Sequence, residues 1–162
     1  NLSMSFLESL RRQRGEAELR EREEAERKVA QEWEATRKKA EEERKRKLRV
    51  KALKKSIVPK LAKELAKLVH GEIHSIQNPW GSSLDTAESL ALNWGLGNSK
   101  HEMGQIIFSG IEDGSISIAG VDTIILDREE AKNLEAFDKA FEHAYKHPKI
   151  WINEPSPYDN GF

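Results

Sequence analysis

The chain has 162 residues, of which 34% are charged and 37% hydrophobic. Its formal net charge of −1 combines a net +7 over residues 1–76 with a net −8 over residues 77–162. This length suits one ordinary domain or a small domain with an appendage, and the uneven charge favours the second arrangement. The chain has no cysteine, which excludes disulfides, thiolate catalysis and cysteine-based zinc sites. No apolar run approaches the ~20 residues of a membrane helix and none resembles a signal peptide, so we expect a cytoplasmic protein.

Residues 1–55 are predicted to form one long charged helix. The segment has one glycine, no proline and nine pairs in which Glu lies four residues before Lys or Arg. Its apolar residues are too few to hold the heptad register of a coiled coil. Two interpretations stay open: a solvated strut, or a helix that binds a larger partner with Val29 and Trp33 as its anchor. We favour the second, because tryptophan is enriched at binding hot spots and an exposed one is hard to explain otherwise on so polar a helix.

The second part of this helix and the segment after it are strongly basic. Residues 37–67 carry a net charge of +10. Such a run usually forms a solvated face, but this charge density is also sufficient to hold a polyanion through phosphate contacts and counterion release. If nucleic acid is the target, the residues expected to contact it are Lys38, Lys39, Arg44, Lys45, Arg46, Lys47, Lys100 and Gln105.

A small globular domain is predicted over residues 56–147. Residues 57–70 are amphipathic and would form its first helix. A second helix, ending at the glycines around Leu96, would carry Ala87, Leu90, Ala91 and Trp94 on one face. A third helix over residues 99–113 would follow a capping box and bury Met103, Ile106, Ile107 and Ile111. After Gly114 the apolar period changes to two, which predicts two short strands within residues 115–126.

This order of helix, turn, helix and strand pair resembles the winged helix-turn-helix superfamily over about residues 56–146. The resemblance implies a mostly α fold with a small β-hairpin, with residues 99–113 in the recognition-helix position and residues 115–126 as the wing. The exposed face of residues 99–110 has one Lys and no Arg, and the wing has no basic residue. DNA-reading elements normally supply such cations, so we expect this acidic domain to dock on protein.

The C-terminal part is predicted to contain one more helix and an aromatic tail. Asp127 and Glu130 would cap a helix over residues 128–146, and Pro148 would end the helical region. The tail of residues 148–162 contains Trp151 and Tyr158. A disordered tail would be poorer in aromatic residues, so we expect it to pack on the domain or to bind a partner.

Two histidine pairs are the nearest approach to a catalytic or metal site. His70 and His74 are four residues apart, as are His143 and His147. On a helix that spacing allows two imidazoles to chelate zinc or nickel, but a complete site needs further ligands and the metalloprotease pattern is absent. No serine nucleophile elbow is present. We therefore predict no enzyme activity, no metal and no cofactor.

These observations predict a non-enzymatic adaptor or assembly subunit of a larger complex. Its long helix would bind a partner protein and its acidic winged-helix-like domain would dock elsewhere, through the partner-binding residues Val29, Trp33, Trp151 and Tyr158. The alternative is a nucleic-acid-binding regulator that uses the basic helix on phosphates, and a third option is a metal-dependent enzyme.

Overall fold

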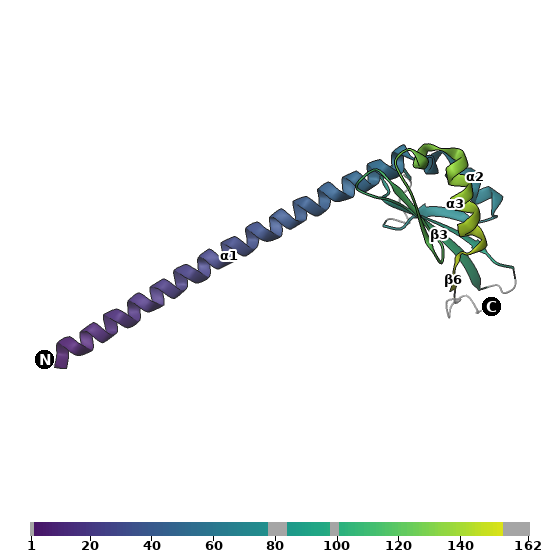
Figure 1. Cartoon of the computed structure of the whole chain (residues 1–162). Coiled ribbons are helices and arrows are strands. Elements are labelled where there is room, and N and C mark those ends of the chain that lie inside the picture. The colour runs from purple at the N-terminus through teal and green to yellow at the C-terminus, as the bar shows by residue number, and fades with distance from the viewer. Residues whose placement is uncertain (1, 78–83, 98–100, 154–162) are drawn as a thin grey trace. The chain divides into compact units, whose positions relative to one another are not determined.

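A computed structural model describes residues 2–77, 84–97 and 101–153 of the chain. The chain divides into two compact units, residues 1–43 and residues 44–162. We call the first the arm and the second the domain, and Figure 1 shows their elements.

Helix α1 (Leu2–Lys55) has 54 residues, which confirms the predicted long helix. Every side chain from residue 5 to residue 40 is exposed, so backbone hydrogen bonds and contacts between side chains of neighbouring turns hold this stretch. The turns from Arg44 onward belong to the domain, and in them exposure falls until Leu53 is fully buried. One helix therefore has two environments.

The domain is built around a six-stranded antiparallel sheet, so the predicted mostly helical winged-helix fold with a small hairpin is wrong. The main path runs in the order β1-β2-β3-β4-β5, and β6 also pairs with β3. Residues 107–110 of β3 pair with β4 and residues 102–105 pair with β6, while β2 pairs along the opposite edge. The strands are β1 (Glu72–Ser75), β2 (Ser89–Gly95), β3 (Glu102–Gly110), β4 (Ile116–Ala119), β5 (Thr123–Leu126) and β6 (Lys149–Ile152).

The two segments predicted as helices before the wing are strands β2 and β3. In β3 the buried positions alternate with partly exposed ones, as in a strand with one face on a core. They are Gly104, Ile106, Phe108 and Gly110. In β2 five successive residues from Leu90 to Trp94 are buried. Because β2 is buried on both faces, its sequence does not alternate between apolar and polar residues. Its apolar residues fit the i, i+3, i+4 spacing of a helix equally well.

Three other predicted elements are confirmed. Helix α2 (Val58–Leu68) begins after Ser56, whose hydroxyl donates to the Leu53 carbonyl (2.6 Å) and accepts the Val58 N–H (3.2 Å). Strands β4 and β5 form the predicted antiparallel pair. Helix α3 (Leu134–Lys146) lies within the last predicted helix but begins later.

The late start of α3 has a local cause. The Asp127 carboxylate accepts the Glu130 N–H (2.9 Å), and the Glu130 carboxylate accepts the Asp127 N–H (3.1 Å). This predicted capping box precedes the short 3₁₀ helix η2 (Glu130–Lys132). The Asn133 side chain then accepts the Ala136 N–H (2.9 Å) and caps α3 itself. A second 3₁₀ helix, η1 (Leu84–Thr86), precedes β2.

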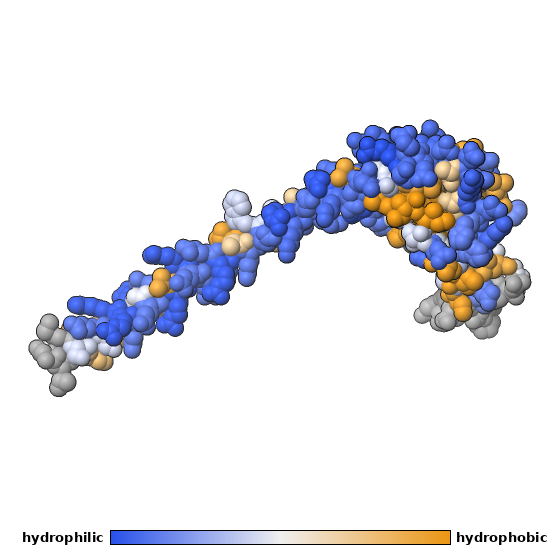
Figure 2. All heavy atoms as spheres, viewed as in Figure 1, coloured by the Kyte–Doolittle hydropathy of each residue, from blue (hydrophilic) through white to orange (hydrophobic). Residues whose placement is uncertain are grey.

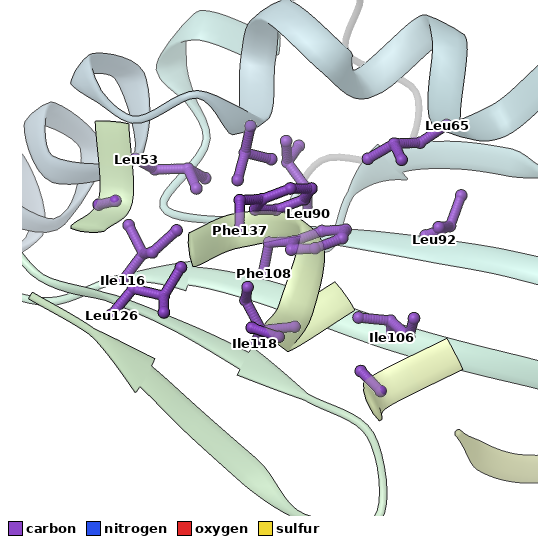
Figure 3. Close-up of a cluster of buried hydrophobic side chains, with 14 of the residues drawn as sticks. Leu53, Leu65, Leu90, Leu92, Ile106, Phe108, Ile116, Ile118, Leu126 and Phe137 are labelled. Atoms are coloured by element: carbon purple, nitrogen blue, oxygen red, sulfur yellow. The ribbon is translucent and has the colours of Figure 1, made fainter. Parts of the chain in front are cut away.

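A single core lies between one face of the sheet and the helices (Figure 3). The aromatic ring of Phe137 from α3 lies 5.9 Å from that of Phe108 on β3. Leu53 from α1 and Leu65 from α2 complete the helical side of the core. Full burial of each such side chain stabilises the fold by about 1.5–3 kcal/mol.

The last turns of α1 are fixed tightly to the sheet. A Cβ on Gly110 would overlap the backbone carbonyl oxygen of Arg49, so only glycine permits this approach. The Arg49 guanidinium also lies 3.2 Å from the Glu88 carboxylate and 3.0 Å from the Glu112 carboxylate. Residues 44–55 are thus an integral part of the domain.

Candidate partner-binding surfaces

An apolar stripe on the arm includes both of the predicted binding residues of this helix. Trp33 is 75% exposed and Val29 is 52% exposed. Successive members of the stripe are spaced 4, 4, 3 and 4 residues apart, so they lie on one side of a helix with 3.6 residues per turn. The arm stripe consists of Ala25, Val29, Trp33, Thr36 and Ala40.

Small side chains on the arm stripe leave hollows on either side of the large ones. One hollow is lined by Trp33, Thr36 and Ala40, and another by Ala25 and Val29. A helix surface in which two large apolar side chains alternate with small ones offers both projections and recesses to a binding partner. In Figure 2 the arm is mostly hydrophilic with isolated apolar spots.

A fixed ion pair borders the arm stripe. The Arg37 guanidinium donates two hydrogen bonds to the Glu34 carboxylate, at 2.6 and 3.0 Å. The hydrogen bond from Arg37 holds the pKa of Glu34 below its usual value. Thr36 is also held, because its hydroxyl donates to the Glu32 carbonyl (2.9 Å). The stripe therefore has a polar rim of defined geometry, as binding surfaces do.

The domain offers a second surface at strand β6. Ile150 and Ile152 are 65% and 63% exposed, and β6 pairs with β3. Within the described ranges no strand pairs with the other edge of β6. Trp151 is 38% exposed, and its indole Nε1 donates to the Asn93 Oδ1 at 3.3 Å. An exposed apolar edge strand of this kind is suited to accept another strand.

Gln105 does not lie on a recognition helix, which corrects the role predicted for it. It is on β3, and its side-chain amide donates to the same Asn93 Oδ1 at 2.9 Å. Sequence reasoning missed Asn93, which joins β2, β3 and β6 on the sheet face opposite the core. The sequence signal for this residue is a polar Asn93 between the apolar Leu92 and Trp94, which is the alternation of a strand.

The predicted basic residues lie at several places along α1. Lys38 and Lys39 are exposed on the arm, whereas the cluster of residues 44–47 is in the domain. Arg44 and Arg46 take part in polar interactions there. Lys100 and Tyr158 lie outside the described residues. Binding of nucleic acid by these residues stays a prediction.

The His70 and His74 pair does not have the helical geometry on which the metal hypothesis depends. Helix α2 ends at Leu68, His70 has a left-handed φ of 54°, and His74 is on β1. The rings of His143 and His147 lie 4.8 Å apart, and His143 Nε2 is 3.2 Å from the Asp122 carboxylate. No group of three metal-ligating side chains was found in the part of the chain that the structure describes.

Comparison of the chain with known protein families, with curated proteins and with solved structures finds no match. A bilayer-spanning helix needs about 20 mostly apolar residues. No helix in residues 2–77, 84–97 and 101–153 meets that requirement.

Proposed function

We propose that this protein is a non-enzymatic adaptor whose arm docks on the apolar surface of a different protein. One observation carries the proposal: Trp33 is 75% exposed at the centre of a one-sided stripe, and the residues of the helix around this stripe are mostly charged. Burying an aromatic ring of this size in a partner's pocket would contribute a large part of the binding free energy.

The composition of the arm stripe supports a partner other than a second copy of the chain. Val29 and Trp33 are its only large apolar members, and the rest are alanine and threonine. Two copies paired along this stripe would lack the sustained apolar a and d positions that hold a coiled coil together. The partner must therefore supply most of the apolar area, as a groove does for an amphipathic helix.

The domain supplies the second contact of the proposed adaptor. Strand β6 presents Ile150 and Ile152 beside an edge that no other strand of the described residues pairs with, next to Trp151 held by Asn93. A partner strand added there would gain main-chain hydrogen bonds, and the exposed isoleucines would give side-chain contacts. The two surfaces let one chain join two partner proteins.

The experiment begins with a photo-crosslinking amino acid placed at position 33 and, as a control, at position 31. Gln31 is exposed and lies on the opposite side of the helix. The proposal expects a defined crosslinked protein from position 33 and none from position 31. Affinity for that purified protein is then measured with wild type, Trp33→Ala and Gln31→Ala.

We expect Trp33→Ala to weaken binding by at least about 2 kcal/mol, the size of a hot-spot loss, and Gln31→Ala to have little effect. Equal affinity of Trp33→Ala and wild type would overturn the proposal. So would a dimer of the chain, seen in analytical ultracentrifugation, that Trp33→Ala dissociates.

A further inference from the structure

A small pocket in the domain gathers four positive charges from three parts of the chain. Its volume is about 220 Å³. Lys51 and Lys55 are four residues apart on the last turns of α1, Lys132 is in η2, and Arg128 follows β5. Glu112 is the only acidic residue in the described lining.

The carboxylates around this pocket are engaged elsewhere. Glu112 pairs with Arg49 at 3.0 Å, and the Asp113 carboxylate accepts the Ser115 N–H at 2.9 Å. The Asp127 carboxylate accepts two backbone N–H groups of the turn that follows it. Within the part of the chain described, none of the four pocket cations forms a salt bridge with a carboxylate. Among the described residues, the four pocket cations thus have no carboxylate as a direct counter-ion.

Repulsion between the positive charges of the pocket disfavours the protonated form of Lys55. The pKa of Lys55 lies below its ordinary value, first because of the nearby charge of Lys51, and further because of the charges of Lys132 and Arg128. A neighbouring positive charge disfavours the protonated form of lysine. An anion among these groups would remove that penalty.

We propose that this pocket binds a phosphate group of a small molecule. The Lys51, Lys55 and Lys132 ammonium groups would each donate to a different phosphate oxygen. The Arg128 guanidinium uses one N–H on the Asp113 carbonyl (3.0 Å) and has further donors. A water molecule takes about 30 Å³ in the liquid, so the pocket has room for one or two phosphate groups, but it is below the usual 300–1,000 Å³ of sites for larger ligands.

The test is calorimetric titration of the full chain with inorganic phosphate, pyrophosphate and glycerol phosphate at constant ionic strength. The double variant Lys55→Gln with Lys132→Gln is compared with the control Lys60→Gln, which removes an exposed charge on α2 away from the pocket lining. We expect saturable binding in wild type and the control, and at least tenfold weaker binding in the double variant. Tighter binding of inorganic phosphate than of glycerol phosphate assigns the free anion as ligand, and the reverse assigns a phosphate ester.

A second readout separates binding at this pocket from general attraction to a basic surface. In an NMR titration of the lysine side chains, saturating phosphate should raise the pKa of Lys55 towards its ordinary value, and the chemical shifts of Lys60 should not respond to added phosphate. No saturable binding at millimolar phosphate, or equal affinities in the double variant and the control, would overturn the proposal. Binding of an oligonucleotide that depends on Lys55 and Lys132, without binding of pyrophosphate, would also overturn it and assign the pocket to nucleic acid.

Discussion

The arm and the domain stabilise parts of the same helix in different ways. In the domain, Leu53 of α1 is fully buried and contributes to the core, and Arg49 is held by two carboxylates. In the arm, Val29 and Trp33 of α1 are 52% and 75% exposed. Burial of side chains stabilises the part of α1 in the domain, and local hydrogen bonds and ion pairs stabilise the part in the arm. This difference is the basis of our proposal that the apolar residues of the arm contact a partner protein.

The largest expected effect comes from opening a cavity in the core. Phe137→Ala should lower the free energy of unfolding of the domain by about 3–5 kcal/mol, because the ring is lost between helix and sheet. Val29→Ala in the arm should change it by less than about 0.5 kcal/mol, since the side chain is exposed. Denaturant unfolding followed by circular dichroism measures both, and a similar cost for the two variants would contradict the comparison.

A pair of glycine substitutions tests how α1 is held in each region. Gly110→Ala should destabilise the domain by about 1–3 kcal/mol, because the new Cβ overlaps the Arg49 carbonyl oxygen. Gly15→Ala, in the arm, meets no neighbouring atom and should increase helicity, because alanine is favoured over glycine in a helix by about 0.5–1 kcal/mol. Thermal unfolding and far-ultraviolet circular dichroism distinguish the two outcomes. A stable Gly110→Ala variant would show that α1 does not approach the sheet this closely.

Two arginine substitutions compare ion pairs in the two regions. Arg49→Met should cost about 1–2 kcal/mol, because it removes hydrogen bonds to two carboxylates from a side chain that is only 21% exposed. Arg37→Met in the arm should cost less than about 0.5 kcal/mol, as expected for an exposed pair. Equal costs in denaturant unfolding would contradict this ranking.

The pH dependence of the Arg49 variant provides a smaller and sharper test. A backbone hydrogen bond and then Arg49 hold the pKa of Glu112 below its ordinary value of 4.5. A carboxyl with a lowered folded-state pKa contributes stability above its unfolded pKa and loses it as pH falls through the folded pKa. The difference in unfolding free energy between wild type and Arg49→Met should therefore shrink from about pH 7 to about pH 3. A difference that stays constant would show that Arg49 does not act through charge.

The sequence predicts elements well where one period dominates. The nine Glu-to-Lys or Glu-to-Arg pairs indicated the long helix, and Ile116, Ile118, Ile124 and Leu126 indicated the β4–β5 hairpin. Prediction from the sequence fails at β2, because burial of Ala91 and Asn93 on the second sheet face removes the alternation of buried and exposed residues. In β3, Ile106 and Ile107 next to Phe108 fit a helical face as well as a strand. The predicted fold is wrong because the sequence patterns of these two strands predict helices.

The arm stripe and the basic pocket also differ in how well the sequence predicts them. Val29 and Trp33 could be selected because their neighbours are charged and the helix is regular. The basic pocket could not be predicted from the sequence, because Lys55 and Arg128 are brought together only by the packing of α1 and η2 with the sheet. Contacts between residues far apart in sequence depend on the fold, and the predicted fold was wrong.

Hydrogen exchange of the purified chain, read by mass spectrometry, tests the difference between arm and domain most directly. If the arm is a helix with no tertiary cover, its amides should exchange orders of magnitude faster than those of β2 and β3, whose opening requires loss of the core. Addition of the crosslinked partner should then slow exchange around Trp33. Arm amides as protected as those of β3 in the isolated chain would contradict the account, because they would show that the arm stripe is already covered.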